Sequence, residues 1–214
     1  MPFVRRLLSL ALPLCAIAAC GSSAAASLGS SSATTAKAQC GPASARTLAV
    51  GAQARVYAQS GAAYGCVSGS RRRYLLGHLS VCVNSDRVGP VVVAGRLAAF
   101  AVTRCGVDTG SATVVLRRLS DGAGLFSHAA AKPAGPEGFV NVTDIVATAS
   151  GAVAWIAHAS SIVGHRSSTG VFVRRGAGLS QLDSGAGIKA GSLRLSGTSV
   201  SWQDGSARRS AHVS

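Results

Sequence analysis

The chain has 214 residues, a formal net charge of +14 and a mean hydropathy of +0.35, and 48% of its residues are hydrophobic. This apolar content excludes a disordered chain and suffices for one folded domain or a small repeat array. Only seven residues are acidic, so the positive excess favours polyanionic partners. Arginine, alanine and glycine are also abundant in proteins from GC-rich genomes, an alternative that explains part of the charge without any partner.

Residues 1–19 have the organisation of an export signal, in which two arginines precede an apolar run. The run is shorter than the roughly 20 residues that a permanent membrane span requires. It ends in Ile17-Ala-Ala-Cys20, which resembles the lipobox of bacterial lipoproteins. The resemblance implies that Cys20 carries lipid in the mature protein. We therefore expect an extracytoplasmic protein anchored to the cell membrane, with simple secretion as the alternative.

Residues 20–39 are rich in serine and alanine and show no apolar periodicity, which predicts a flexible tether after the lipidated cysteine. The folded domain is expected over residues 40–214. Because an exported protein meets the cell envelope, we expect its anionic partners to be lipid headgroups or cell-wall polymers. Export argues against nucleic acid as a partner.

Six cysteines are present, of which Cys15 leaves with the signal. The cysteines of the predicted folded domain are Cys40, Cys66, Cys82 and Cys105. In an oxidising compartment they predict two disulfides, and the sequence alone leaves three connectivities open. None has C-x-x-C spacing, which argues against a zinc site or a redox-active pair.

The chain repeats weakly from Cys40 onward, in four segments that join a glycine to an alternating apolar strand. The anchor glycines are Gly51, Gly95, Gly151 and Gly197, spaced 44, 56 and 46 residues apart. A period near 45 occurs in propeller blades and in some helical repeats. The alternation has period two, which favours strands over helices.

Each segment continues with a turn and a second strand, as at Asp204-Gly205, a dipeptide that favours hairpins. Three to four strands joined by tight turns are typical of a propeller blade. We therefore predict an all-β fold of about four propeller-like units, with a four-bladed ring, an open arc or two chains completing one ring all left open. Aromatic and apolar residues should wedge between adjacent sheets: Phe100, Trp155, Trp202 and either Val56 or Tyr57.

Two motifs carry a family resemblance, S-G-x-V-x-W at residues 150–155 and V-x-V-R-R at residues 171–175. They resemble blades of secreted bacterial propeller proteins of the Tol–Pal translocation type, and the whole chain resembles actinobacterial secreted lipoproteins with such repeats. That family implies six blades, whereas four units are visible here. Because equivalent turns of adjacent blades lie close together, we expect Cys66 to pair with Cys105, and Cys40 with Cys82.

Arginine pairs also recur, near the second strand of each unit's hairpin. They are Arg72-Arg73, Arg117-Arg118, Arg174-Arg175 and Arg208-Arg209. If the units are blades, these guanidinium groups gather on one rim and could bind phosphates. The alternative is that they are solvated strand ends that protect an exposed sheet edge from aggregation.

Catalytic motifs such as G-x-S-x-G, H-E-x-x-H and the P-loop are missing from the sequence. The five histidines lack metal-ligand spacing, so we expect no metal site and no cofactor. We predict a binding or scaffolding role at the cell envelope. The alternatives are a cell-wall-directed hydrolase, in which Asp108, Asp144 and Asp183 meet in a central pocket, and a structural partner of another envelope protein.

Overall fold

The computed structural model of the chain describes residues 40–80, 86–135 and 137–213. The predicted signal, the tether with Cys20, and Cys82 lie outside these residues. The described part is all-β, as the sequence predicts. Its one helical element is a short 3-10 turn, η1 (Val163–His165), in the turn between two strands.

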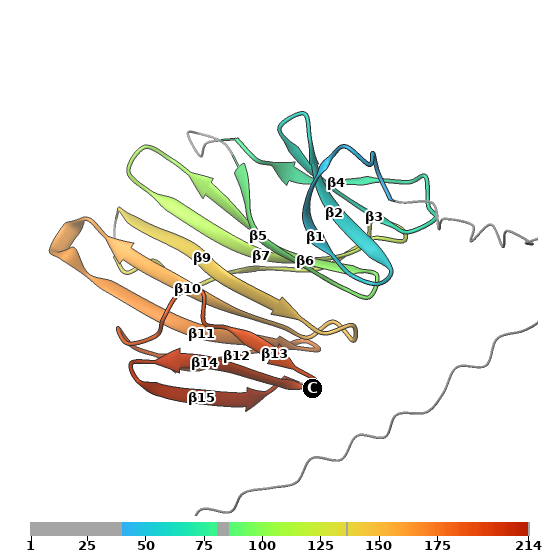
Figure 1. The fold of residues 1–214 in the computed structure, drawn as a ribbon. Coiled ribbons are helices and arrows are strands. Elements are labelled where there is room, and N and C mark those ends of the chain that lie inside the picture. The colour runs from blue at the N-terminus through green and yellow to red at the C-terminus, as the bar shows by residue number, and fades with distance from the viewer. Residues whose placement is uncertain (1–39, 81–85, 136, 214) are drawn as a thin grey trace, which may run out of the picture. The chain divides into compact units, whose positions relative to one another are not determined.

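The strands form four successive antiparallel meanders, in which each strand pairs with the next one along the chain (Figure 1). Meander 1 contains β1 (Arg46–Val50), β2 (Ala54–Gln59), β3 (Ala62–Val67) and β4 (Tyr74–His78). Meander 2 contains β5 (Asp86–Ala94), β6 (Leu97–Cys105), β7 (Gly110–Arg118) and β8 (Gly124–Ala129). Meander 3 contains β9 (Gly138–Ala147), β10 (Val153–Ser161), β11 (Ser167–Arg175) and β12 (Gly178–Ser184). Meander 4 contains β13 (Arg194–Ser196), β14 (Ser199–Asp204) and β15 (Ala207–His212).

These meanders coincide with the four repeats predicted from the sequence, but they do not form four separate sheets. A single parallel residue pair between β7 and β9, Gly110 with Phe139, joins meanders 2 and 3 into one eight-stranded sheet. Meanders 1 and 4 are separate sheets of four and three strands. No sheet built from the described residues closes on itself, so a four-unit propeller is not confirmed.

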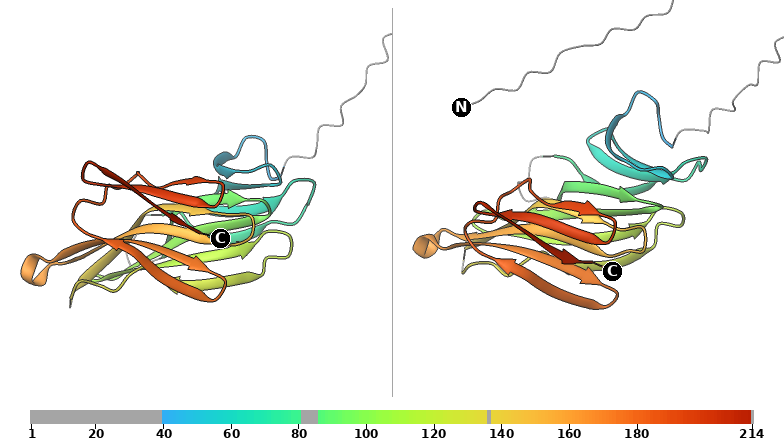
Figure 2. Two further views of the ribbon diagram at one scale, coloured as in Figure 1. Left: turned by 90° about the horizontal axis from the view of Figure 1, so that it is seen from below. Right: turned by 60° about the horizontal axis from the view of Figure 1, so that its bottom comes forward.

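Successive meanders pack through apolar clusters, which we call the first, second and third junctions in chain order. The first strands of neighbouring meanders also contact one another, β1 with β5, β5 with β9 and β9 with β13. Figure 2 shows the third junction, where the red strands of meander 4 lie over the orange strands of meander 3. Alternation along each strand therefore sends one set of side chains towards the preceding meander and the other towards the following one.

The predicted wedge residues occupy these junctions. Phe100 and Val56 are buried in the first junction, Trp155 in the second and Trp202 in the third. Tyr57, by contrast, is buried on the other face of meander 1, beside Cys40 and Cys66. At the junctions these large side chains pack among alanine, valine, leucine and isoleucine residues.

The repeated glycines mark one turn in every meander, between its first and second strands. Gly95, Gly151 and Gly197 adopt positive φ angles of 60°, 96° and 57°. A side chain with a Cβ disfavours this region, which explains why glycine recurs there. Gly51 occupies the corresponding turn without a positive φ.

The predicted pairings of Cys66 with Cys105 and of Cys40 with Cys82 are both wrong, because Cys66 is bonded to Cys40 with a Cα–Cα distance of 5.6 Å. Cys66 pairs across the sheet with Arg55, so its side chain lies on the face of meander 1 turned away from meander 2. Cys105, at the end of β6, is also disulfide-bonded.

The segment before β1 is held against this outer face by Arg55, whose side chain is only 4% exposed. Its guanidinium donates hydrogen bonds to the carbonyl oxygens of Cys40, Pro42 and Ala45. Its Nε donates to the Thr47 hydroxyl at 2.9 Å. The disulfide and this arginine together cap the first sheet of the array.

Candidate functional site

One arginine from each of three predicted pairs reaches back to the preceding meander. Arg117 donates a 2.6 Å hydrogen bond to the carbonyl oxygen of Leu75 in β4. Arg174 lies over the ring of Phe126 in β8, with its guanidinium carbon 4.2 Å from the ring centroid. Arg209 forms an ion pair with Asp183 in β12 at 3.3 Å. In all three contacts, an arginine of the third strand binds the fourth strand of the meander before it.

Strand alternation explains why only one member of each pair makes this contact. Arg174 pairs across the sheet with Val153, a residue of the second junction, and Arg209 pairs with Trp202 of the third. The adjacent arginine in each pair must therefore point to the opposite face. In each of these pairs, one arginine therefore binds the preceding meander, and the other is available for other contacts.

Arg72 and Arg73 lie in the loop before β4 of meander 1, the first meander among the described residues. Arg73 donates to the Gln59 side-chain oxygen at 2.6 Å and lies over the ring of Tyr64 at 4.9 Å. Arg73 therefore packs on the capped outer face of meander 1, whereas Arg72 is solvent-exposed.

One face of the meander 4 sheet is not covered by another sheet of the described residues. Because Val200 and Trp202 point into the third junction, the alternate residues face outward. Cross-strand register places on this outer face Arg194, Ser196, Ser199, Ser201, Gln203, Arg208, Ser210 and His212. All are polar, as is typical of a sheet face that is exposed to solvent.

A pocket of about 360 Å³ opens beside this face and collects three cations, Lys189, Arg194 and Arg208. Lys189 lies in the loop between β12 and β13, and its backbone N–H donates a 2.9 Å hydrogen bond to the Gln203 carbonyl oxygen. The Ser192 hydroxyl bridges Lys189 and Gln203. It donates to the Lys189 carbonyl oxygen at 2.6 Å and accepts from the Gln203 backbone N–H at 3.1 Å. We call this pocket, whose lining includes Lys189, Ser192, Arg194, Gln203 and Arg208, the cationic pocket.

The cationic pocket contains no acidic residue in its lining, and its three cations form no ion pair with any described carboxylate. Ion pairs in the described chain engage only Arg104, Arg118 and Arg209. Arg208 donates instead to the Ser201 hydroxyl at 3.0 Å. The pocket is therefore a concentration of positive charge that an anion can neutralise.

Two of the carboxylates that do form ion pairs carry shifted pKa values. The pKa of Asp86 lies below its ordinary value of 3.8, chiefly because Arg104 donates a hydrogen bond to it. The pKa of Asp121 is also lowered, first by the backbone N–H of Ala123 and then by Arg118. Both carboxylates are thereby held in the charged form on the surface.

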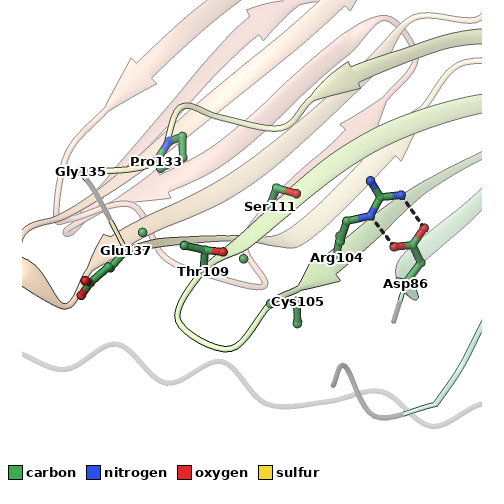
Figure 3. Close-up of a pocket in the computed structure, with 11 residues that line it drawn as sticks. Asp86, Arg104, Cys105, Thr109, Ser111, Pro133, Gly135 and Glu137 are labelled. Atoms are coloured by element: carbon green, nitrogen blue, oxygen red, sulfur yellow. Dashed lines mark hydrogen bonds and ion pairs between the residues drawn. The ribbon is translucent and has the colours of Figure 1, made fainter. Parts of the chain in front are cut away.

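Another pocket, of about 610 Å³, lies beside the hairpin between β6 and β7 (Figure 3). Its charged groups are largely satisfied by one another, because Arg104 binds Asp86 through two hydrogen bonds of 2.8 and 3.1 Å. Figure 3 places Glu137 across the hollow from this ion pair. The arrangement leaves no unpaired cation to recruit an anionic ligand there.

The three aspartates expected for a hydrolase do not come together. Asp144 in β9 and Asp183 in β12 are three strand spacings apart in one sheet, about 14 Å. Asp108 lies in the turn after β6. The carboxylates that do converge are Asp183 and Asp204, which share Arg209, while Asp183 also accepts a 2.7 Å hydrogen bond from the Trp202 indole.

Histidine and acidic side chains of the described chain do not gather into any group of three that could hold a metal ion. His158 is engaged with the Thr169 hydroxyl at 3.0 Å. No helix among the described residues has the length and apolar character that a membrane crossing requires.

Sequence reasoning found Arg208 but missed Lys189 and Arg194. These two cations are isolated in the sequence, so no repeated pattern draws attention to them. The available signal was the alternation of polar residues in two neighbouring segments, Arg194 and Ser196 before the glycine turn and Ser199, Ser201 and Gln203 after it, which indicates an uncovered sheet face.

Known protein-family models and curated proteins were compared with the chain, and none matches it. The resemblance to Tol–Pal-type propeller blades stays a prediction.

Proposed function

We propose that the chain is a membrane-anchored extracytoplasmic lipoprotein that binds phosphate-bearing polyanions of the cell envelope through the cationic pocket. The observation that carries this proposal is the convergence of Lys189, Arg194 and Arg208 without a carboxylate partner. Guanidinium groups bind phosphate oxygens through paired, charge-assisted hydrogen bonds, and a lysine adds a further donor.

A polymer or an array of headgroups suits this surface better than a single small anion. Each exposed ion pair contributes at most about 1 kcal/mol, so useful affinity requires several contacts made together. The rest of the outer face of meander 4 supplies serine hydroxyls, Gln203 and His212 as neighbouring hydrogen-bonding groups. A repeating phosphate chain can use these groups in succession.

The anchor in this proposal is Cys20, and the supporting observation is the sequence before it. The folded domain begins at meander 1, whose outer face is capped, whereas the cationic pocket lies on meander 4. The propeller-like character of the units is part of the same proposal. It is supported by the meander in each repeat and by the contacts between successive first strands.

The binding experiment compares two triple variants with the same loss of charge. K189Q/R194Q/R208Q removes the pocket cations, and R46Q/R96Q/R166Q removes three exposed arginines elsewhere. The probes are soluble polyphosphate, vesicles of phosphatidylglycerol and phosphatidylcholine, and vesicles of phosphatidylcholine alone. We expect the pocket variant to lose about tenfold in affinity for the anionic probes and the control to lose far less.

Salt and lipid composition separate the possible results. Binding should weaken as salt is raised and should be absent with neutral vesicles. Preference for polyphosphate over anionic vesicles identifies a wall polymer as the source of phosphate, and the reverse identifies headgroups. Equal losses in the two triple variants would show that net charge, and not the pocket, governs binding.

The anchor has its own test, in which Cys20→Ser is expressed in a bacterium with a lipoprotein pathway. We expect the wild-type protein in the membrane fraction and the variant in the soluble extracytoplasmic fraction. Unchanged membrane retention of the variant would contradict lipidation at this residue.

A further inference from the structure

A second cavity, of about 480 Å³, lies at the second junction, where β8 of meander 2 faces β11 and β12 of meander 3. Its apolar lining includes Ala130, Ala157, Phe172 and Leu179. Lys132 and Gln181 are polar groups at the same cavity. Its volume lies in the range of small-molecule sites in proteins.

The cavity exists because small residues lie at positions where larger side chains would fill it. Ala130 and Ala157 are almost completely buried, with 0% and 1% exposure. Gly170 pairs across the sheet with Ala157, and a Cβ on it would lie 2.7 Å from the Phe172 ring. The ring therefore lies across the glycine and forms a wall of the cavity.

The aromatic wall is rigid. Phe172 stacks on Trp155, with ring centroids 5.7 Å apart and planes 17° apart. The Trp155 indole is itself fixed by a 2.8 Å hydrogen bond to the Ala130 carbonyl oxygen. Trp155 is fully buried, whereas Phe172 is only partly buried and retains a surface for a ligand. A preformed apolar wall lowers the ordering cost of binding.

The charge at the cavity selects the kind of ligand. Lys132 lines it, no acidic residue does, and Lys132 forms no ion pair with the described carboxylates. We propose that this cavity binds a small molecule with an apolar body and one anionic group, the body against Phe172 and the anion at Lys132. The site shares no residue with the cationic pocket, so it stands independently of the proposed function.

The test uses the full folded domain with Trp202→Phe, so that Trp155 is the only tryptophan. The first probe is 8-anilinonaphthalene-1-sulfonate, whose binding is followed by energy transfer from Trp155. In addition, calorimetry compares octanoate with octanol, which has the same alkyl chain length but no anionic group. We expect one site per chain and tighter binding of octanoate than of octanol.

Filling variants test the location of the site. Ala157→Leu and Ala131→Leu place extra methyl groups in the lining, and we expect each to weaken probe binding by about tenfold or more. Lys132→Gln should weaken binding of the anionic probes by about fivefold, and the control Arg46→Gln, which removes an exposed cation of meander 1, should leave it unchanged. Near-ultraviolet circular dichroism identifies which filling variant retains native packing.

Three results would overturn the proposal. The first is probe binding that persists unchanged in a natively packed filling variant. The second is an Arg46→Gln effect as large as that of Lys132→Gln, because the charge would then act from a distance. The third is equal affinity for octanol and octanoate, which would contradict the assignment of an anionic ligand.

Discussion

Trp155→Phe is the substitution that tests most sharply how the meanders are held together. Trp155 is fully buried at the second junction, and its indole donates to the Ala130 carbonyl oxygen at 2.8 Å. Phenylalanine preserves an aromatic ring against Phe172 but has no donor. The Ala130 carbonyl oxygen, in a residue that is itself 0% exposed, is then left without its partner.

The expected cost combines two effects. An unpaired buried carbonyl costs about 1–3 kcal/mol, and the void left by the smaller ring adds about 1 kcal/mol. We therefore expect the free energy of unfolding to fall by about 2–4 kcal/mol, a large share of the stability of a small domain.

The assay is urea unfolding followed by far-ultraviolet circular dichroism, which does not depend on tryptophan. The control is Phe172→Leu, which removes the ring stacking on Trp155 but keeps the indole hydrogen bond. We expect Trp155→Phe to be the more destabilising of the two. If it costs less than the control, the buried hydrogen bond does not hold this junction.

Two further predictions concern the disulfide and acid stability. Cys40→Ala/Cys66→Ala should lower the free energy of unfolding by about 3 kcal/mol, because the bond spans 26 residues; an equally stable double variant in denaturant titrations would contradict this. Because the pKa values of Asp86 and Asp121 are lowered in the folded state, these carboxylates contribute stability that is fully present above pH 3.8, their ordinary pKa. That stability is lost as the pH falls through their lower pKa values in the folded protein. Asp86→Asn should therefore flatten the acid side of the stability curve slightly, as measured by urea unfolding across acidic pH.

Local features of the fold were predictable from the sequence. The four glycine turns and the wedge residues Phe100, Trp155 and Trp202 follow from short-range patterns, and the structure confirms them. Period-two alternation also identified the strands, because one face of each is buried in a junction. These features need no knowledge of which sheet lies next to which.

Features that depend on which way a side chain faces were not predictable. The pairing of Cys66 failed because its cross-strand position opposite Arg55 turns it away from the first junction. The division of the arginine pairs has the same origin, since Arg208 and Arg209 are adjacent but face opposite sides of one sheet. The cationic pocket requires a loop, β13 and β15 to meet, which no local pattern encodes.

The neighbouring residues Arg208 and Arg209 test most directly the claim that outward cations bind anions while inward ones hold the sheets together. Arg209→Gln should lower the free energy of unfolding by about 1 kcal/mol and leave polyphosphate affinity nearly unchanged, because it removes the contacts with Asp183 and Asp204. Arg208→Gln should weaken polyphosphate binding severalfold at unchanged stability. Indistinguishable effects of the two substitutions, in both unfolding and binding, would contradict the account.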